Sequence, residues 1–249
     1  MHHEYSFLFG PLNALLTLIL GPAPEWWQKA MGVTGQPGIW LPDHVVMALL
    51  VVAVVALLAV TVRLRLSLDR PSSLQLFTEQ LVSAFRNMAE SVIGHGQGAS
   101  FVPFIASLAF FIFLSNIFGL FFFLQPPTGT PSTTFALSIT AFLFYNLVGI
   151  RRNGFLGYAK HFAGPVWWLA PLMVPIEIIS HLARVLSLGL RLFGNIFGEH
   201  TAAAMFFAMI PIFWPWPMMG LGILGSTIQT FVFVMLTTVY IAGAVAEEH

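Results

Sequence analysis

The sequence predicts an all-α protein that crosses a membrane several times, and three observations support this fold class. Hydrophobic residues make up 57% of the 249 residues. Only 8% are charged, against roughly 25% in a soluble domain. The mean hydropathy is +0.85, and several apolar stretches approach the ~20 residues that a spanning helix needs. We expect a single membrane domain over residues 1–249, with about five membrane-embedded helices and one amphipathic surface helix.

Charge and residue types argue against several other classes of protein. Ten basic and ten acidic residues give a formal net charge of zero, so nothing favours a nucleic-acid partner. The absence of cysteine excludes a disulfide framework and a thiolate metal site. No HxxxH pair occurs, and His181 and His200 lie far apart on the expected helix. We therefore expect no cofactor and no metal.

The positions of the basic residues predict the orientation of the first crossings. Seven of the ten follow two apolar stretches, 45–62 and 133–150, and these are Arg63, Arg65, Arg70, Arg86, Arg151, Arg152 and Lys160. Basic residues favour the cytoplasmic side of a membrane. The uncharged, proline-containing segment 125–132 between them is typical of an external turn. We expect the N-terminal segment 1–42 outside and the C-terminus in the cytoplasm.

The segments before residue 150 follow from this orientation. The first apolar stretch, 7–20, has about 14 residues and is too short to span, whereas 43–62 forms the first crossing. Residues 71–93 place apolar side chains at helical spacing opposite Glu79, Arg86 and Glu90. This pattern predicts a helix on the cytoplasmic membrane surface, or else a solvated helix that packs on a partner. Residues 101–124 cross outward and 131–150 return.

The last third predicts two long helices joined by a turn. No proline interrupts 176–210, so a continuous helix there would be about 50 Å long, whereas the hydrocarbon core is about 30 Å thick. Such a helix must tilt or bend. Pro211 and a Trp-Pro-Trp-Pro cluster at 214–217 force a turn before a second apolar stretch. We predict a hairpin of two steeply inclined helices, 166–210 and 218–246.

Polar residues inside these two helices follow helical spacing. Glu177, Arg184 and Arg191 are seven residues apart, and His181 and Asn195 interleave with them on one stripe. A milder polar stripe on the second helix consists of Gly222, Ser226, Gln229, Thr237 and Tyr240. Polar groups in hydrocarbon need partners or water, so we expect the two stripes to face each other with aqueous access.

Arg191 is the strongest functional candidate. The nearest charged residues in sequence are seven and eight positions away, and a guanidinium at mid-membrane costs about 2.5–3.5 kcal/mol. We expect Arg191 to meet a carboxylate of another subunit or to lie in a polar cavity; the alternative is pairing within the chain through Asn195 and Gln229.

Two further groups of polar residues lie on the same helix. For Glu177, His181 and Arg184 the alternative to a functional role is a structural ion pair near the cytoplasmic end. Glu199 and His200 join a carboxylate to an imidazole, which suits proton transfer at neutral pH.

Two glycine patterns are interpreted as packing features. Residues 220–225 fit GxGxxG, but no preceding strand exists to form a dinucleotide site. Residues 194–198 fit GxxxG, which allows a neighbouring helix to approach closely and would bring a partner near Arg191.

These residues carry a resemblance to a known family. The runs SLGLRLFGN at 187–195 and QTFVF at 229–233, and the ending from Tyr240 to His249, resemble subunit a of bacterial F-type ATP synthases. The resemblance covers most of the chain. It implies a proton-conducting stator of the membrane sector, not an enzyme on its own, in the lipid bilayer of the bacterial inner membrane. Its implied partners are a rotating ring of c subunits, a b-subunit peripheral stalk and the other ATP synthase subunits.

The resemblance also implies roles for individual residues. Arg191 falls on the essential arginine that separates two aqueous half-channels and interacts with a ring carboxylate. The implied proton path has Asn116, Glu199, His200 and Gln229 toward the inlet and Glu177 and Arg184 toward the cytoplasmic outlet, and Asn195 falls on a polar position one turn after Arg191. His181, on the same stripe, is a further candidate for the proton path. The chain departs from the family pattern at Gly222, where a His can occur, and at Gly119, where an acidic residue can occur. Proton coupling is the default expectation, with sodium as the alternative.

Two other classes compete with this interpretation. A secondary ion transporter usually shows internal repeats, and this sequence has none. A structural membrane scaffold would leave Arg191 unexplained.

Overall fold

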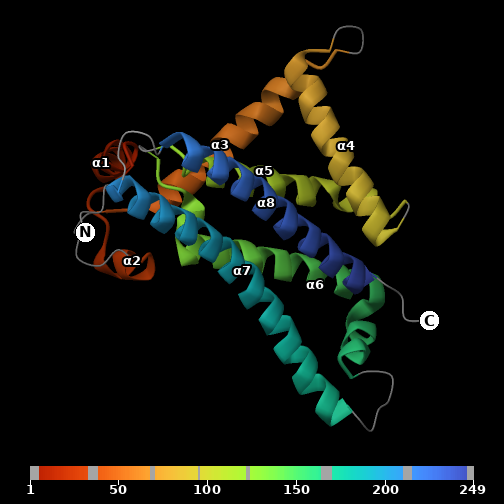
Figure 1. Cartoon of the computed structure of the whole chain (residues 1–249). Helices are drawn as coiled ribbons and strands as arrows, with labels where there is room; N and C mark the ends of the chain where they lie inside the picture. The colour runs from red at the N-terminus through yellow and green to blue at the C-terminus, as the bar shows by residue number, and fades with distance from the viewer. Residues whose placement is uncertain are drawn as a thin grey trace.

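The computed structural model describes residues 6–32, 39–67, 71–94, 96–121, 124–163, 170–209 and 215–245. The regular elements in these ranges are all helices (Figure 1). Five of them are long and apolar enough to cross a membrane. The predicted class, an all-α polytopic membrane protein, is confirmed.

Two short helices precede the first crossing, α1 (Phe9–Leu20) and α2 (Glu25–Ala30). At 12 residues, α1 is apolar but too short to span a bilayer. Asn13 holds it to the chain before the first crossing, because its side-chain oxygen accepts hydrogen bonds from the backbone N–H groups of Trp40 (2.9 Å) and Leu41 (3.0 Å). The N-terminal region therefore has a defined fold of its own.

The first crossing and the amphipathic helix correspond to α3 (Asp43–Leu64) and α4 (Ser73–Ile93). The hydroxyl of Ser72 caps α4 by accepting a bond from the backbone N–H of Gln75 at 3.2 Å. In Figure 1, α3 and α4 diverge from the other helices as two sides of a triangle, and α4 returns to the start of α5. The placement of α4 on a membrane surface stays a prediction.

The next two crossings are α5 (Val102–Phe118), entered through a 3-10 turn η1 (Gly98–Phe101), and α6 (Pro131–Ala163). A second 3-10 turn, η2 (Pro127–Gly129), precedes α6. The α5 helix ends at Phe118, earlier than the expected boundary at residue 124. Helix α6 continues beyond residue 150 and is interrupted at Gly154, whose φ of 71° is a conformation that favours glycine.

The last two helices are α7 (Ala170–Met209) and α8 (Pro215–Val245). The 40 residues of α7 correspond to about 60 Å at ~1.5 Å per residue, twice the ~30 Å of a hydrocarbon core. A helix of this length must tilt, bend or extend past the hydrocarbon core, and its steep inclination stays a prediction. It also begins earlier than the proline-free stretch, since Pro175 lies within its first two turns.

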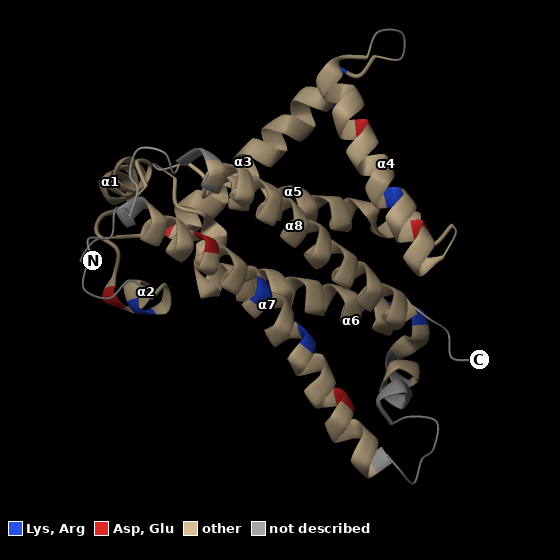
Figure 2. Cartoon of the chain, viewed as in Figure 1, with Lys and Arg blue, Asp and Glu red and all other residues tan. Residues whose placement is uncertain are grey.

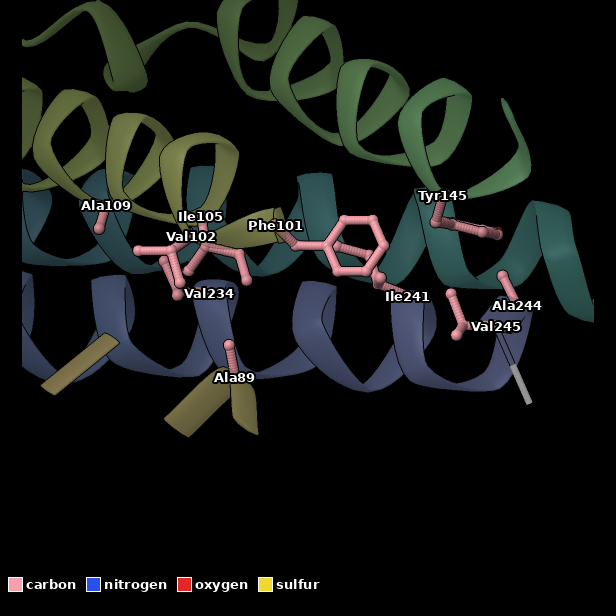
Figure 3. Close-up of a cluster of buried hydrophobic side chains, with 10 residues drawn as sticks. All are labelled: Ala89, Phe101, Val102, Ile105, Ala109, Tyr145, Val234, Ile241, Ala244 and Val245. Atoms are coloured by element: carbon pink, nitrogen blue, oxygen red, sulfur yellow. The ribbon is translucent and has the colours of Figure 1, made fainter. Parts of the chain in front are cut away.

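Two buried clusters hold the helices together. The first joins α4, η1, α5, α6 and α8 (Figure 3) through Ala89, Phe101, Val102, Ile105, Ala109, Tyr145, Val234, Ile241, Ala244 and Val245. The second joins α5, α6, α7 and α8 through Leu108, Ile112, Ala141, Leu188, Leu192 and Phe233. The second cluster fixes the rotation of α7, and with it the directions of the polar side chains described below.

Candidate functional site

The buried face of α7 determines which of its polar residues are exposed. Leu188, Leu192 and Ile196 are buried at spacings of four, so this stripe faces the other helices. Arg191 and Asn195 lie beside it and are exposed. Figure 2 shows charged residues spaced along the ribbon of α7, whereas α5 and α8 have none in the described residues. Of these three helices, α7 is therefore the one that carries charged side chains in the described residues.

Arg191 has no ionic partner within the described part of the chain. Its one hydrogen bond runs from the guanidinium Nη2 to Ser187 Oγ at 3.3 Å. The ion pairs of α7 involve Glu177, His181 and Arg184 instead. Pairing through Asn195 and Gln229, the alternative considered above, is not seen among the described residues. The guanidinium is therefore available to a carboxylate from outside the chain.

The surface of α7 around Arg191 consists of glycines and exposed apolar residues. A Cβ atom added at Gly194 or Gly198 would meet no other atom within 4 Å, and Leu190 and Phe197 are exposed. Among the described residues, no helix packs against the GxxxG pattern at Gly194 and Gly198. Small and apolar residues on this side would let a neighbouring helix approach the arginine closely.

Toward the start of α7, three predicted residues come together as an ion-pair cluster. His181 Nε2 lies 3.2 Å from Glu177 Oε1, and Arg184 Nη2 lies 3.8 Å from the same oxygen. His181 is buried, and its Nδ1 lies 3.0 Å from the hydroxyl of Tyr145 on α6. The guanidinium of Arg184 lies over the ring of Tyr240 on α8, 5.5 Å from its centre, a cation–π distance. Three helices thus meet at this cluster.

Two turns after Arg191 on α7, Glu199 lies against two glycines of α8, Gly222 and Gly225. A Cβ added at Gly222 would overlap Glu199 Oε1 and Leu120 Cδ2, and one at Gly225 would lie 3.7 Å from Glu199 Oε2. The same position on Gly225 lies 3.8 Å from Asn195 Nδ2. Two glycines of the GxGxxG pattern therefore make room for a carboxylate. The departure at Gly222 is explained by the side chain of Glu199, which occupies the space.

The neighbouring His200 occupies a comparable space beside α5. A Cβ added at Gly119 would lie 2.9 Å from His200 Nε2 and 2.9 Å from Pro126 Cγ. The second departure from the family pattern thus also coincides with a site residue. Glu199 and His200 project to different neighbours, α8 and the end of α5, so they are adjacent in sequence without sharing one pocket.

Buried polar side chains occur on both α5 and α8, two helices that pack against each other, and the term polar seam is used for Ser115, Asn116, Ser226 and Gln229. Asn116 is buried, and its Oδ1 accepts a hydrogen bond from Thr128 Oγ1 at 2.7 Å. Within the described residues, four buried side-chain atoms have no hydrogen-bond partner, namely Ser115 Oγ, Asn116 Nδ2, Ser226 Oγ and Gln229 Nε2. The contact of Leu120 with Gly222 sets the antiparallel register, which brings Ser115 and Asn116 to the level of Ser226.

The site residues fall into two groups separated along α7. Glu177, His181 and Arg184 form the cluster at one end, and Asn116, Glu199 and His200 lie toward the other. Arg191 and Asn195 lie between them, and the contact of Gly225 with Asn195 places Gln229, four residues later on α8, near the level of Arg191. By helix rise, Arg191 is about 21 Å from Glu177 and about 12 Å from Glu199. Sequence reasoning missed Tyr145, Ser115 and Thr128. A lone tyrosine or hydroxyl in an apolar stretch gives no periodic signal, since its partner lies on another helix.

Comparison with known proteins identifies a family whose match includes both groups of site residues. Residues 45–242 match the family model described as the ATP synthase A chain. This match includes α3 to α8 almost entirely and contains every predicted site residue.

Several curated proteins are similar along most of their length. The chain is 36% identical over 244 residues to ATP synthase subunit a of Koribacter versatilis, covering 98% of this chain and 95% of that protein. It is 41% identical over 242 residues to ATP synthase subunit a of Solibacter usitatus, covering 97% and 98%. It is 49% identical over 179 residues to ATP synthase subunit a of Trichlorobacter lovleyi, covering 72% and 77%.

Proposed function

The chain belongs to the ATP synthase subunit a family, and on this premise we propose that it forms two aqueous half-channels against a rotating c-ring, with Arg191 between them. It is a multi-pass membrane subunit of the proton-translocating sector. Other ATP synthase subunits are its partners; contact with the c-ring and with a b-subunit stalk belongs to the proposal.

One observation carries the proposal, the exposed guanidinium of Arg191 without an ionic partner in the described residues. A carboxylate of a passing c subunit could supply the missing charge. At ~4 Å and an effective dielectric constant of about 20, the attraction is about 4 kcal/mol. This attraction favours the deprotonated carboxylate beside Arg191. The same fixed charge repels a proton that would otherwise pass directly between the half-channels.

The inlet half-channel would use the residues beyond Arg191. Buried polar atoms normally have hydrogen-bond partners, so the unpartnered atoms of Asn116, Ser226 and Gln229 support a hydrated seam between α5 and α8. Glu199 and His200 add two groups able to exchange protons beside this seam. A proton arriving there neutralises the ring carboxylate, which can then move into lipid.

The outlet half-channel would use the ion-pair cluster. After nearly a full rotation the protonated carboxylate returns to the side of α7 that carries Glu177. His181 Nε2 and Arg184 Nη2 lie 3.2 Å and 3.8 Å from Glu177 Oε1, so the carboxyl group of Glu177 is held in place where a proton leaving the ring could pass to it and then to cytoplasmic water.

The test is ATP-driven acidification of inverted membrane vesicles that contain the whole ATP synthase. Arg191→Ala should assemble, because the side chain is exposed, yet should not pump. Arg191→Lys should also pump poorly, because an ammonium lacks the planar fork of donors that guanidinium offers to a carboxylate. Passive proton leak is recorded in each preparation to detect joined half-channels.

The matched control is Arg86→Ala on α4. That arginine is exposed and forms a surface pair with Glu90 at 3.0 Å, so its loss should cost little. Normal pumping by assembled Arg191→Ala complexes would contradict the stator mechanism. It would favour the alternative that the chain is a structural membrane scaffold.

A further inference from the structure

A continuous chain of hydrogen-bonding atoms connects α6 to the carboxylate of Glu177. The hydroxyl of Tyr145 lies 3.0 Å from His181 Nδ1, and the opposite ring nitrogen, Nε2, lies 3.2 Å from Glu177 Oε1. Tyr145 and His181 are 2% and 6% exposed, so neither can replace these contacts readily with bulk water. Glu177 is more accessible, with 28% of its side chain exposed.

The chemistry of the three groups assigns the donors. An ionised carboxylate can only accept hydrogen bonds, so the nitrogen facing Glu177 must carry a proton. A neutral imidazole has a single N–H, which leaves a lone pair on Nδ1. The hydroxyl of Tyr145 therefore donates to Nδ1. If the ring becomes doubly protonated, the same hydroxyl can turn and accept from Nδ1–H.

We propose that Tyr145 is a positioning residue of the proton outlet, which locks His181 in the tautomer that donates to Glu177. This inference rests on the proposed function, because it assigns Glu177 to the outlet path. In this tautomer, Nε2–H of His181 donates a hydrogen bond to Oε1 of Glu177. In the other tautomer, Nε2 would present a lone pair to the carboxylate, which would favour a proton held between them.

The groups around His181 come from all three packed helices. On α7 these are Glu177 and Arg184; on α6 Tyr145 faces the ring and Phe142 meets its edge. On α8 the nearest polar ring is Tyr240, whose centre lies 5.8 Å from that of Tyr145. Among the described residues, Glu177 is the carboxylate of this cluster, so the tautomer of His181 acts directly on the group that exchanges protons.

The proton balance of the step is simple. A proton from the ring side forms an O–H bond at Glu177 while His181 Nε2–H continues to donate to the carboxyl group. That O–H bond breaks when the proton passes to water on the cytoplasmic side. Tyr145 and His181 keep their own protons throughout. Tyr145 thus acts through His181 and does not itself carry the transported proton.

The experiment compares Tyr145→Phe with Tyr158→Phe in whole ATP synthase in inverted vesicles. Both changes remove one buried phenol hydroxyl of α6. The Tyr158 hydroxyl donates to Asn146 Oδ1 at 2.6 Å, and Tyr158 interacts electrostatically with Arg184 and Glu177, so its loss tests the effect of removing a phenol hydroxyl close to the same carboxylate. Burial raises the pKa of Tyr158, an effect that Arg184 partly offsets, so this hydroxyl stays a donor. ATP-driven pumping and passive proton conductance are measured over a range of cytoplasmic pH.

Loss of the lock should lower passive conductance in Tyr145→Phe by about two- to tenfold, the factor that one hydrogen bond usually represents. The pH of half-maximal pumping should move by about 0.3 to 1 unit, the same factor on a pH scale. Tyr158→Phe should show neither effect. Equal effects of the two substitutions would indicate lost packing and overturn the proposal.

A double-mutant cycle separates positioning from packing. In a His181→Leu background, Tyr145→Phe should change conductance by less than about twofold, since no tautomer remains to be set. An undiminished effect there would overturn the proposal. Arg191→Ala, measured in parallel, reports on the proposed function: if it pumps normally the stator mechanism fails. If it does not pump while Tyr145→Phe behaves as native, only the tautomer lock fails.

Discussion

Glu199 on α7 and Gly222 on α8 act as one unit, since the carboxylate occupies space that any side chain at position 222 would need. The opposing atoms are the ends of two flexible side chains, Glu199 and Leu120, and not backbone. A small side chain at 222 can therefore be accommodated by moving the carboxylate. The geometry thus predicts a defect in proton transfer more than a defect in folding.

Gly222→Ala should displace the Glu199 carboxylate and slow proton uptake. Overpacking of this kind costs about 1–3 kcal/mol, so pumping should fall about fivefold or more while the complex still assembles. The measurement is ATP-driven acidification with the amount of assembled complex determined in the same vesicles. Combining the change with Glu199→Asp, which shortens the side chain by one methylene, should restore part of the activity.

Gly220→Ala is the matched control for this prediction. It lies one half-turn away on α8, and a Cβ there would meet nothing within 4 Å. Alanine is also the better helix former, so the control should pump normally. If Gly222→Ala pumps as well as Gly220→Ala, then the position of the Glu199 carboxylate does not limit proton uptake.

Single residues differ in how visible they are in the sequence. Arg191 stands out because its charge has no counterpart within seven positions. Its exposure and lack of an ionic partner in the described residues agree with that prediction, while its role stays proposed. Tyr145 could not be found in this way, because its importance depends on a histidine 36 residues later that only tertiary packing brings within 3.0 Å.

At the scale of elements, the buried amide of Asn13 joins the N-terminal helix α1 to the segment before α3, and Ser6 adds bonds to Asp43 at the start of α3. Asn13 accepts from two backbone N–H groups and donates to the carbonyl oxygens of Phe9 (3.1 Å) and Leu41 (3.0 Å). Two indoles add bonds around it, Trp27 to the Trp40 carbonyl and Trp40 to the Gly21 carbonyl. The apolar side chains of α1 can therefore remain exposed while its polar groups are satisfied, as a helix in contact with lipid requires.

Asn13→Leu should release α1 from the start of the first crossing. It leaves the backbone donors of Trp40 and Leu41 without an acceptor, at about 1–3 kcal/mol for each buried group. Limited proteolysis of the complex should then cleave the chain before α3 several-fold faster. Gln28→Leu is the control, since within the described residues the Gln28 amide donates to the nearby Ala23 carbonyl at 2.9 Å and not to the segment before α3. Equal cleavage rates in native and Asn13→Leu complexes would show that the indoles suffice.

Element boundaries were less predictable than element positions. The stretch 101–124 is apolar to its end, yet α5 stops at Phe118, where Gly119 fits between His200 and Pro126. Hydropathy cannot reveal such a stop, because the helix ends inside a continuous apolar stretch. Conversely, α6 continues past residue 150 through charged residues until Gly154, since a helix ends on backbone conformation and not where hydrophobicity ends.

At the scale of the whole molecule, periodicity and length predicted the helices but not which of them pack together. The second buried cluster joins α5, α6, α7 and α8, and it is this packing that turns Leu188 and Leu192 inward and leaves Arg191 exposed. The polar seam of Asn116 and Ser226 depends likewise on the antiparallel register of α5 and α8. Sequence spacing predicts which polar residues share one face of a helix. Which helix packs against that face depends on the tertiary fold.

The orientation of the protein in the membrane determines whether protons enter near Glu199 or near Glu177. The chain has no cysteine, so Gln125→Cys and Leu66→Cys each introduce a unique thiol at an exposed position. The basic residues that follow the apolar stretches 45–62 and 133–150 predict a cytoplasmic Leu66→Cys and an external Gln125→Cys. A membrane-impermeant maleimide should then label Gln125→Cys in intact cells and Leu66→Cys in inverted vesicles. The reverse pattern would place the Glu177 cluster outside and the Glu199 carboxylate on the cytoplasmic side, so that protons would enter where we propose that they leave.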